Sequence, residues 1–159
     1  MKVYLGIGTN LGDREKNIND ALGMIVEHIG RVKQTSSIYE TEPWGFTSES
    51  DFLNIAAEVE TRLKPSGLLG RILMIEANMG RLRDEKKYAS RLIDIDILLY
   101  GDKMLEAKTL VIPHPRLHER KFVLVPLNEI AGDSVHPKLG KTIKELLKEC
   151  ADKSRVKKF

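Results

Sequence analysis

Two aspartates stand two residues apart in an otherwise apolar run, SRLIDIDILLY, at residues 90–100 of the 159-residue chain. Because alternate residues of a strand point to the same face, Asp94 and Asp96 are expected to share one face. The opposite face is expected to carry the apolar side chains of Ile93, Ile95, Ile97 and Leu99. Two carboxylates about 6.6 Å apart at Cα can hold two Mg²⁺ ions against a polyphosphate, which offsets their mutual repulsion. The alternative is a strand whose solvent-facing side is acidic, but aspartate is depleted in strands.

A basic stretch leads into this acidic segment. Residues 81–91, RLRDEKKYASR, hold five basic and two acidic residues. Guanidinium groups grip phosphate oxygens bidentately and stay charged at any working pH. For Arg91, three residues before Asp94, a functional role is favoured, whereas Lys86 is better explained as part of a solvated loop. The two segments together predict a magnesium-dependent phosphoryl transfer.

A glycine-containing segment, GIGTNLGD, lies between a strand-like and a helix-like segment near the start of the chain. It lacks the Lys-Ser/Thr pair of a P-loop and the third glycine of the dinucleotide fingerprint. We interpret it as a tight turn into a helix, with the first strand ending at Gly6 and Gly8.

Other candidate residues are less specific. His114 stands between two prolines, and Pro115 disfavours helix at residue 114, so His114 and His118 should not form an i, i+4 metal pair. Phe52 and Phe122 have the pattern of core residues. Cys150 is the only cysteine, which excludes an intrachain disulfide, and it should lie in the core on the last helix.

Composition indicates one soluble domain over residues 1–159, with 42% hydrophobic residues, 31% charged residues and a net charge of +3. No apolar run reaches transmembrane length, and the N-terminus is strand-like instead of resembling a signal peptide. We therefore expect a cytoplasmic protein without membrane association. We also expect a monomer, because no exposed apolar stripe stands out in the sequence.

The pattern of elements predicts the fold class. We expect strands near residues 2–8, 31–41, 52–63 and 93–99, and helices over residues 9–30, 65–80 and 142–150, the last with a capping box at Thr142 and Glu145. This order favours an α+β fold, a ferredoxin-like αβα sandwich with a mostly antiparallel sheet and helices packed on both faces.

The segment KYASRLIDIDILLY, residues 87–100, resembles the signature of the 6-hydroxymethyl-7,8-dihydropterin pyrophosphokinase family of folate biosynthesis. The resemblance extends over nearly the whole chain through GIGTNLGD, YETEPWG, FLNIAAEVET, IEANMGRLR and VIPHPRLHERKFVLVPL. It implies transfer of the β,γ-pyrophosphoryl group of ATP to the hydroxymethyl oxygen of the pterin, with AMP as the second product.

The resemblance also implies residue roles. Asp94 and Asp96 would hold two Mg²⁺ ions, while Arg81 and Arg91 would stabilise charge on the transferring group. Residues on the ATP side would be Glu76, Arg83, Tyr88, His114 and Arg120, with Tyr88 standing where many members have Trp. Phe52 and Phe122 would stack on the two faces of the pterin ring. Asn54 and the segment from Thr41 through Glu42 to Trp44 would read its hydrogen-bonding edge.

Two other functions stay open from the residues alone. A related two-metal phosphotransferase or nucleotidyltransferase could use the same carboxylates on another acceptor. An RNA-binding module on a ferredoxin-like sheet fits the mild positive charge, but no strand carries the paired aromatics that stack bases, and the acidic pair would repel a phosphate backbone. We expect small-molecule substrates and no nucleic acid.

Overall fold

The chain forms an antiparallel sheet in a computed structural model that describes residues 1–41, 51–80 and 92–159. The strands lie in the order β5-β1-β4-β3-β8, and β2 also pairs with β4. Their bounds are β1 Lys2–Thr9, β2 Gly30–Thr35, β3 Tyr39–Thr41, β4 Phe52–Thr61, β5 Asp94–Tyr100 and β8 Val156–Lys158. A separate hairpin pairs β6 (Leu105–Glu106) with β7 (Val111–Ile112).

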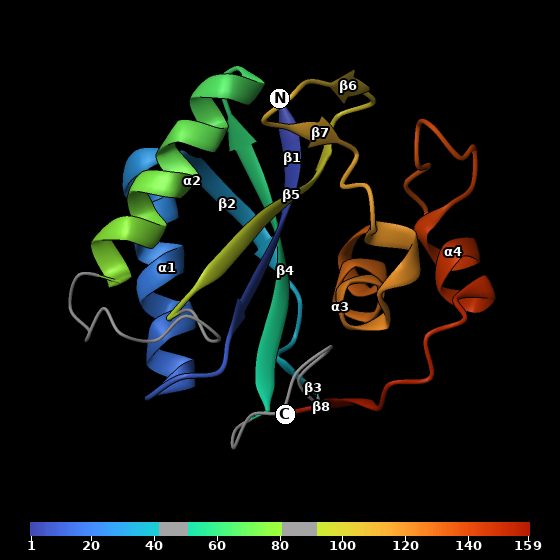
Figure 1. The fold of residues 1–159 in the computed structure, drawn as a ribbon, viewed down its shortest axis with the longest axis horizontal. Coiled ribbons are helices and arrows are strands. Elements are labelled where there is room, and N and C mark those ends of the chain that lie inside the picture. The colour runs from blue at the N-terminus through green and yellow to red at the C-terminus, as the bar shows by residue number, and fades with distance from the viewer. Residues whose placement is uncertain (42–50, 81–91) are drawn as a thin grey trace.

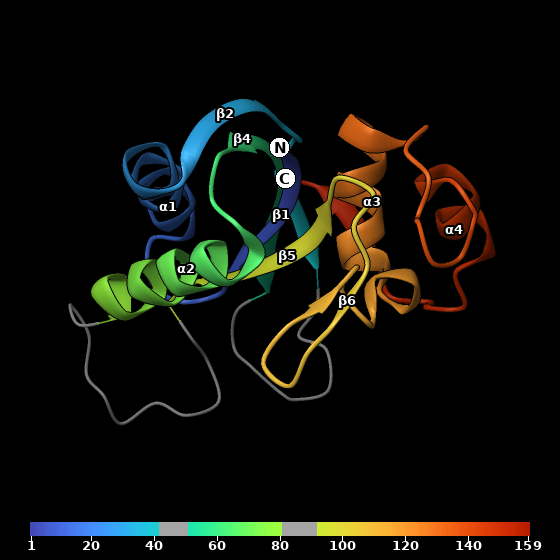
Figure 2. The same ribbon diagram turned by 90° about the horizontal axis from the view of Figure 1, so that it is seen from above.

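Helices cover both faces of the sheet (Figure 1; Figure 2 shows the same layers from above). On one face lie α1 (Arg14–His28) and α2 (Pro65–Gly80), and on the other lie α3 (Lys121–Ala131) and α4 (Ile143–Glu149). A short 3₁₀ turn, η1 (Leu117–Glu119), leads into α3. The α+β sandwich expected from the sequence is therefore confirmed. None of the helices in the described part of the chain is long and apolar enough to cross a membrane.

Local signals explain two helix starts. Asp13 caps α1 by accepting the backbone N–H of Lys16 at 3.2 Å, because the first amides of a helix have no partner within the helix. Thr142 and Glu145 form the expected capping box, with the Thr142 hydroxyl accepting from the Glu145 amide at 3.1 Å and Glu145 accepting from the Thr142 amide at 3.0 Å.

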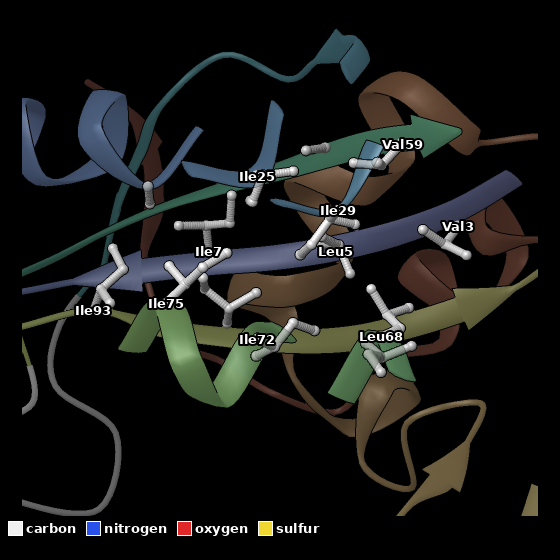
Figure 3. Close-up of a cluster of buried hydrophobic side chains, with 14 of the residues drawn as sticks. Val3, Leu5, Ile7, Ile25, Ile29, Val59, Leu68, Ile72, Ile75 and Ile93 are labelled. Atoms are coloured by element: carbon white, nitrogen blue, oxygen red, sulfur yellow. The ribbon is translucent and has the colours of Figure 1, made fainter. Parts of the chain in front are cut away.

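The larger core lies between the sheet and the pair α1 and α2 (Figure 3). It is built from aliphatic side chains at alternate positions of β1 and at helical spacing on α1 and α2. Members labelled in Figure 3 include Val3, Leu5, Ile7, Ile25, Leu68, Ile72, Ile75 and Ile93. This core fixes one face of the strands, so the residues between its members must point toward α3.

A second core lies between the sheet and α3 and continues between α3 and α4, and it includes Leu98 and Leu99. From the strand alternation, Leu99 was expected on the same face as Ile95 and Ile97. Ile95 and Ile97 do pack in the larger core, but Leu99 packs in the second core, so this prediction was wrong. The pairing of β1 with β5 shifts between Tyr4 and Leu5, so that β5 carries one extra residue there. A bulge of this kind reverses the alternation beyond it.

Three further expectations need correction. The first strand does not end at Gly6 and Gly8 but runs through both to Thr9. The strand expected over residues 31–41 is interrupted, since β2 ends at Thr35 and β3 begins at Tyr39. Cys150 is only partly buried against the second core, because it lies just past the last turn of α4.

Candidate active site

A pocket of about 180 Å³ opens on the α3 face of the sheet, between β1, β4, β5 and the start of α3. Most of its walls come from polar or aromatic side chains and from glycine backbone. The lining residues include Gly6, Gly8, Thr41, Phe52, Asn54, Asp94, Asp96, Arg120 and Phe122. Its volume is below the roughly 300–1,000 Å³ of sites for drug-sized ligands, so the described part of the site is small.

The acidic pair faces this pocket. Asp94 and Asp96 are both partly buried, while Ile95 between them is buried in the larger core on the other face. The alternation predicted for this part of the strand is thus confirmed. The two carboxylates therefore face the same pocket, which is lined with hydrogen-bonding and aromatic groups.

The floor between the acidic pair and β4 is made by two glycines. Gly8 pairs with Asn54 on one side and with Asp94 on the other, and Gly6 pairs with Ala56 and Asp96. A Cβ added at Gly8 would come within 2.6 Å of the Asn54 Oδ1 atom. The absence of side chains at these positions keeps the pocket open. Sequence reasoning missed this role, although glycines two residues apart within a strand signal a close approach.

The opposite wall presents a polar edge beside two rings. The Asn54 amide donates to the Thr41 hydroxyl at 3.0 Å, and Asn54 is only 8% exposed. Thr41 and Phe52 are paired residues of β3 and β4. The Arg120 guanidinium lies 5.7 Å from the ring centroid of Phe122, within cation–π range. Five residues predicted from the sequence to bind substrate or ATP therefore meet in one pocket.

His114 does not line this pocket, but the charges of two pocket residues, Arg120 and Asp94, shift its pKa. Burial lowers the pKa of His114 from its ordinary value, the positive charge of Arg120 lowers it further, and the carboxylate of Asp94 opposes both. Its Nδ1 accepts the backbone N–H of Arg116 at 3.1 Å. The neutral ring then carries its proton on Nε2, which can donate to an anionic oxygen.

Glu76 reaches the acidic strand from the α2 side. Its Oε2 accepts the backbone N–H of Ile95 at 2.9 Å. The residue is partly buried and does not line the pocket itself. Its observed contact is with the backbone that carries the acidic pair. Six other predicted site residues lie outside the described residues: Glu42, Trp44, Arg81, Arg83, Tyr88 and Arg91.

The carboxylates of Asp94 and Asp96 fit Mg²⁺, which prefers oxygen ligands and is usually held through one or two carboxylates plus substrate phosphates. No cluster of three or more His, Cys, Asp or Glu side chains suited to a metal occurs among the residues that the structure describes.

A small pocket lined by two phenylalanine rings beside paired carboxylates fits an enzyme that transfers a phosphoryl-type group to a ring-containing acceptor. Residues 4–132 match the family model described as 7,8-dihydro-6-hydroxymethylpterin-pyrophosphokinase. The chain is 40% identical over 147 residues to the 2-amino-4-hydroxy-6-hydroxymethyldihydropteridine pyrophosphokinase of Aquifex aeolicus, covering 92% of this chain and 91% of that protein. The chain belongs to this pyrophosphokinase family.

Other relatives are longer. The folic acid synthesis protein fol1 of Pneumocystis carinii is 41% identical over 150 residues, which is 94% of this chain but only 20% of that protein. The structure of Plasmodium falciparum HPPK-DHPS wild type with STZ-DHP shares the fold, with a TM-score of 0.74 and 19% identity, over 93% of this chain and 43% of that one. Membership of the family makes the chain an ATP-dependent diphosphotransferase that acts on hydroxymethyldihydropterin in folate synthesis.

Proposed function

We propose that the pocket binds the reduced pterin and that Asp94 and Asp96 hold two Mg²⁺ ions beside its hydroxymethyl group. The observation that carries this assignment is that both carboxylates line one pocket with Phe52 and Phe122. A planar heterocycle between two rings gains stacking energy, and the small volume of the pocket matches one bicyclic ring.

The pterin would be oriented by the polar wall. Asn54 and Thr41 are held together by their hydrogen bond, so they present a fixed set of donors and acceptors to the ring edge. Glu42 and Trp44, assigned to the same edge by the family resemblance, belong to this proposal. Phe52 and Phe122 hold the ring so that its hydroxymethyl oxygen lies toward the acidic strand.

Residues at and before the start of α3 would stabilise the negative charge of the phosphates. Arg120 lines the pocket, and His114 beside it can donate from Nε2. We assign both to the ATP phosphates. Glu76 stays assigned to the nucleotide side, where it orients β5 through the Ile95 amide. From the segment 81–91, we assign Arg81 and Arg91 to the transferring group, and Arg83 and Tyr88 to ATP.

In the reaction, the hydroxymethyl oxygen attacks the β-phosphorus of ATP while the bond from that phosphorus to the α,β-bridging oxygen breaks. AMP leaves with the bridging oxygen, and the hydroxyl proton is released. When bound, Mg²⁺ supplies neutralisation of triphosphate charge and polarisation of the attacking hydroxyl. Arg120 stabilises charge on the phosphate oxygens because its guanidinium remains protonated.

We further propose that residues 1–159 act as one domain, because the strands other than the β6–β7 hairpin all join one sheet, and that the chain is a monomer. Use of ATP and a reduced pterin fits a cytoplasmic setting. Sedimentation of the purified chain at several concentrations tests the monomer, and a concentration-dependent dimer would contradict it.

The reaction is tested by incubating the protein with ATP and Mg²⁺, with the pterin alcohol supplied or withheld, and identifying the nucleotide. AMP formed only with pterin supports the proposal. ADP would indicate an ordinary kinase, and free pyrophosphate a nucleotidyltransferase. Chelation with EDTA should abolish AMP formation, and excess Mg²⁺ should restore it. Activity that persists in EDTA would overturn the metal assignment.

A further inference from the structure

Arg14, the first residue of α1, joins two segments that are far apart in sequence. Its Nη1 atom donates to the Glu40 carboxylate at 2.9 Å and to the backbone carbonyl of Asp51 at 2.8 Å. The two hydrogens on one guanidinium nitrogen can serve both acceptors at once. The side chains of Arg14 and Glu40 are only 23% and 19% exposed, so this ion pair is better shielded from solvent than a typical surface pair.

The two partners of Arg14 stand next to residues of the pocket. Glu40 immediately precedes Thr41, and Asp51 immediately precedes Phe52. Thr41 and Phe52 are paired across β3 and β4, and both line the pocket. Arg14 therefore bridges a β3 side chain and the backbone just before β4, next to the residues that form a polar and an aromatic wall of the pocket.

The same guanidinium also meets the C-terminal segment. Its Cζ atom lies 5.6 Å from the ring centroid of Phe159, within cation–π range. β8 pairs along the outer edge of β3, and the Phe159 amide donates to the Ile38 carbonyl at 2.8 Å (Figure 1 shows β8 beside β3). β3 has only three residues, which is at the short end for a strand. Arg14 thus links α1 to β3, to the start of β4 and to the last residue of the chain.

We propose that Arg14 is a positioning residue for pterin binding, acting through Glu40 and the Asp51 carbonyl on Thr41 and Phe52. This inference rests on the proposed pterin pocket. Arg14 is not among the residues that line the pocket, so we assign it a positioning role and not a direct contact with the pterin. Its loss should weaken binding of the pterin and leave binding of ATP nearly unchanged.

The test compares Arg14→Met and Glu40→Gln with a matched control, Lys16→Met. Lys16 lies on the same helix and forms a 2.7 Å ion pair with Asp20, but on an exposed surface away from β3. Pterin affinity is measured by its intrinsic fluorescence with Mg²⁺ and α,β-methylene-ATP, in which the bond broken in the reaction is blocked. KM for pterin and for ATP are measured in parallel.

We expect Arg14→Met to weaken pterin binding and raise the pterin KM by roughly three- to tenfold, with the ATP KM changed by less than about twofold, as for loss of partly shielded charge-assisted hydrogen bonds. Glu40→Gln should have a smaller effect in the same direction. Arg14→Lys, which keeps the charge but not the planar fork, should restore part of the affinity. Lys16→Met should match the wild-type protein.

Equal pterin affinity in Arg14→Met and the wild-type protein would overturn the positioning role. The positioning role would also be overturned if Arg14→Met raised both KM values equally and lowered the melting temperature, because that pattern indicates a general loss of structure. If the wild-type protein itself fails to bind the pterin, the proposed function fails instead, and the two failures are thereby told apart.

Discussion

The Glu76 carboxylate accepts the backbone N–H of Ile95 at 2.9 Å, and Ile95 lies between the two aspartates of the pocket. β5 is the terminal strand of the described sheet, paired with β1 along one edge. An amide on the outer edge of such a strand needs a partner from outside the sheet. Glu76 supplies it from α2 and so holds the acidic strand against that helix.

Glu76 could act by orienting β5 through the Ile95 amide or by placing its charge near the nucleotide, and two substitutions distinguish these roles. If it orients β5, Glu76→Gln should keep most activity, because an amide oxygen can still accept from Ile95. Glu76→Ala should lower the free energy of unfolding by about 1–3 kcal/mol, because the Ile95 amide loses its acceptor. Chemical denaturation and the ATP KM are the measurements. A large rise in the ATP KM of Glu76→Gln would show that the charge itself serves the nucleotide.

The acidic pair provides the most direct test of the metal site. Asp94→Asn and Asp96→Asn should each lower kcat by at least about 10²-fold, because each removes an anionic ligand from a site where charge develops. The melting temperature should not fall, since neutralising one of two neighbouring carboxylates relieves repulsion. Asp102→Asn is the control, because Asp102 is exposed in the turn after β5. Full activity in either pocket variant would remove the metal role.

Gly8 should tolerate no side chain. An alanine Cβ there would lie 2.6 Å from the Asn54 Oδ1 atom, so Asn54 must move and its hydrogen bond to Thr41 must change. We expect Gly8→Ala to raise the pterin KM at least about tenfold, as for loss of an oriented polar contact in a buried site.

Gly23→Ala is the matched control for Gly8→Ala. It lies within α1, and an added Cβ there has no neighbour within 4 Å. It should therefore leave KM unchanged and raise the free energy of unfolding by about 0.5–1 kcal/mol. A normal pterin KM in Gly8→Ala would mean that the floor of the pocket is not where the ring binds.

His136 should make stability depend on pH. It is 3% exposed, and burial, followed by the charge of His118, lowers its pKa from the ordinary 6.5. The unfolded chain therefore binds the proton more readily, so the free energy of unfolding should fall as pH drops below about 6.5 toward the lowered folded-state pKa. Stability from this group is fully present only above that window.

His136→Asn tests this dependence. The Nδ1 atom of His136 accepts the backbone amides of Lys138 at 3.2 Å and Leu139 at 3.1 Å, and the Asn side-chain oxygen can accept in their place. Denaturation between pH 7.5 and 5 should show a smaller loss of stability in His136→Asn than in the wild-type protein. His28→Asn, on α1, is the control. Identical pH profiles for the wild type and His136→Asn would contradict the assignment.

Short-range patterns predicted the parts of this protein that depend on neighbours in sequence. The helix from Pro65, the capping box at Thr142 and the opposite faces of Asp94 and Ile95 all follow from spacing that the backbone imposes locally. Leu99 was misplaced because the bulge depends on the register of β5 against β1, some 90 residues away in the chain.

The α+β class, the family and the acidic pair could be predicted from the sequence, because strand and helix periods and a long signature depend on contiguous residues. Which residues share the pocket became clear only from the folded chain. The close approach of Gly8 to Asn54, the contact of Glu76 with Ile95 and the contacts of Arg14 with Glu40 and Asp51 join distant segments. Such contacts follow from packing two layers of helices on one sheet, which no local pattern encodes.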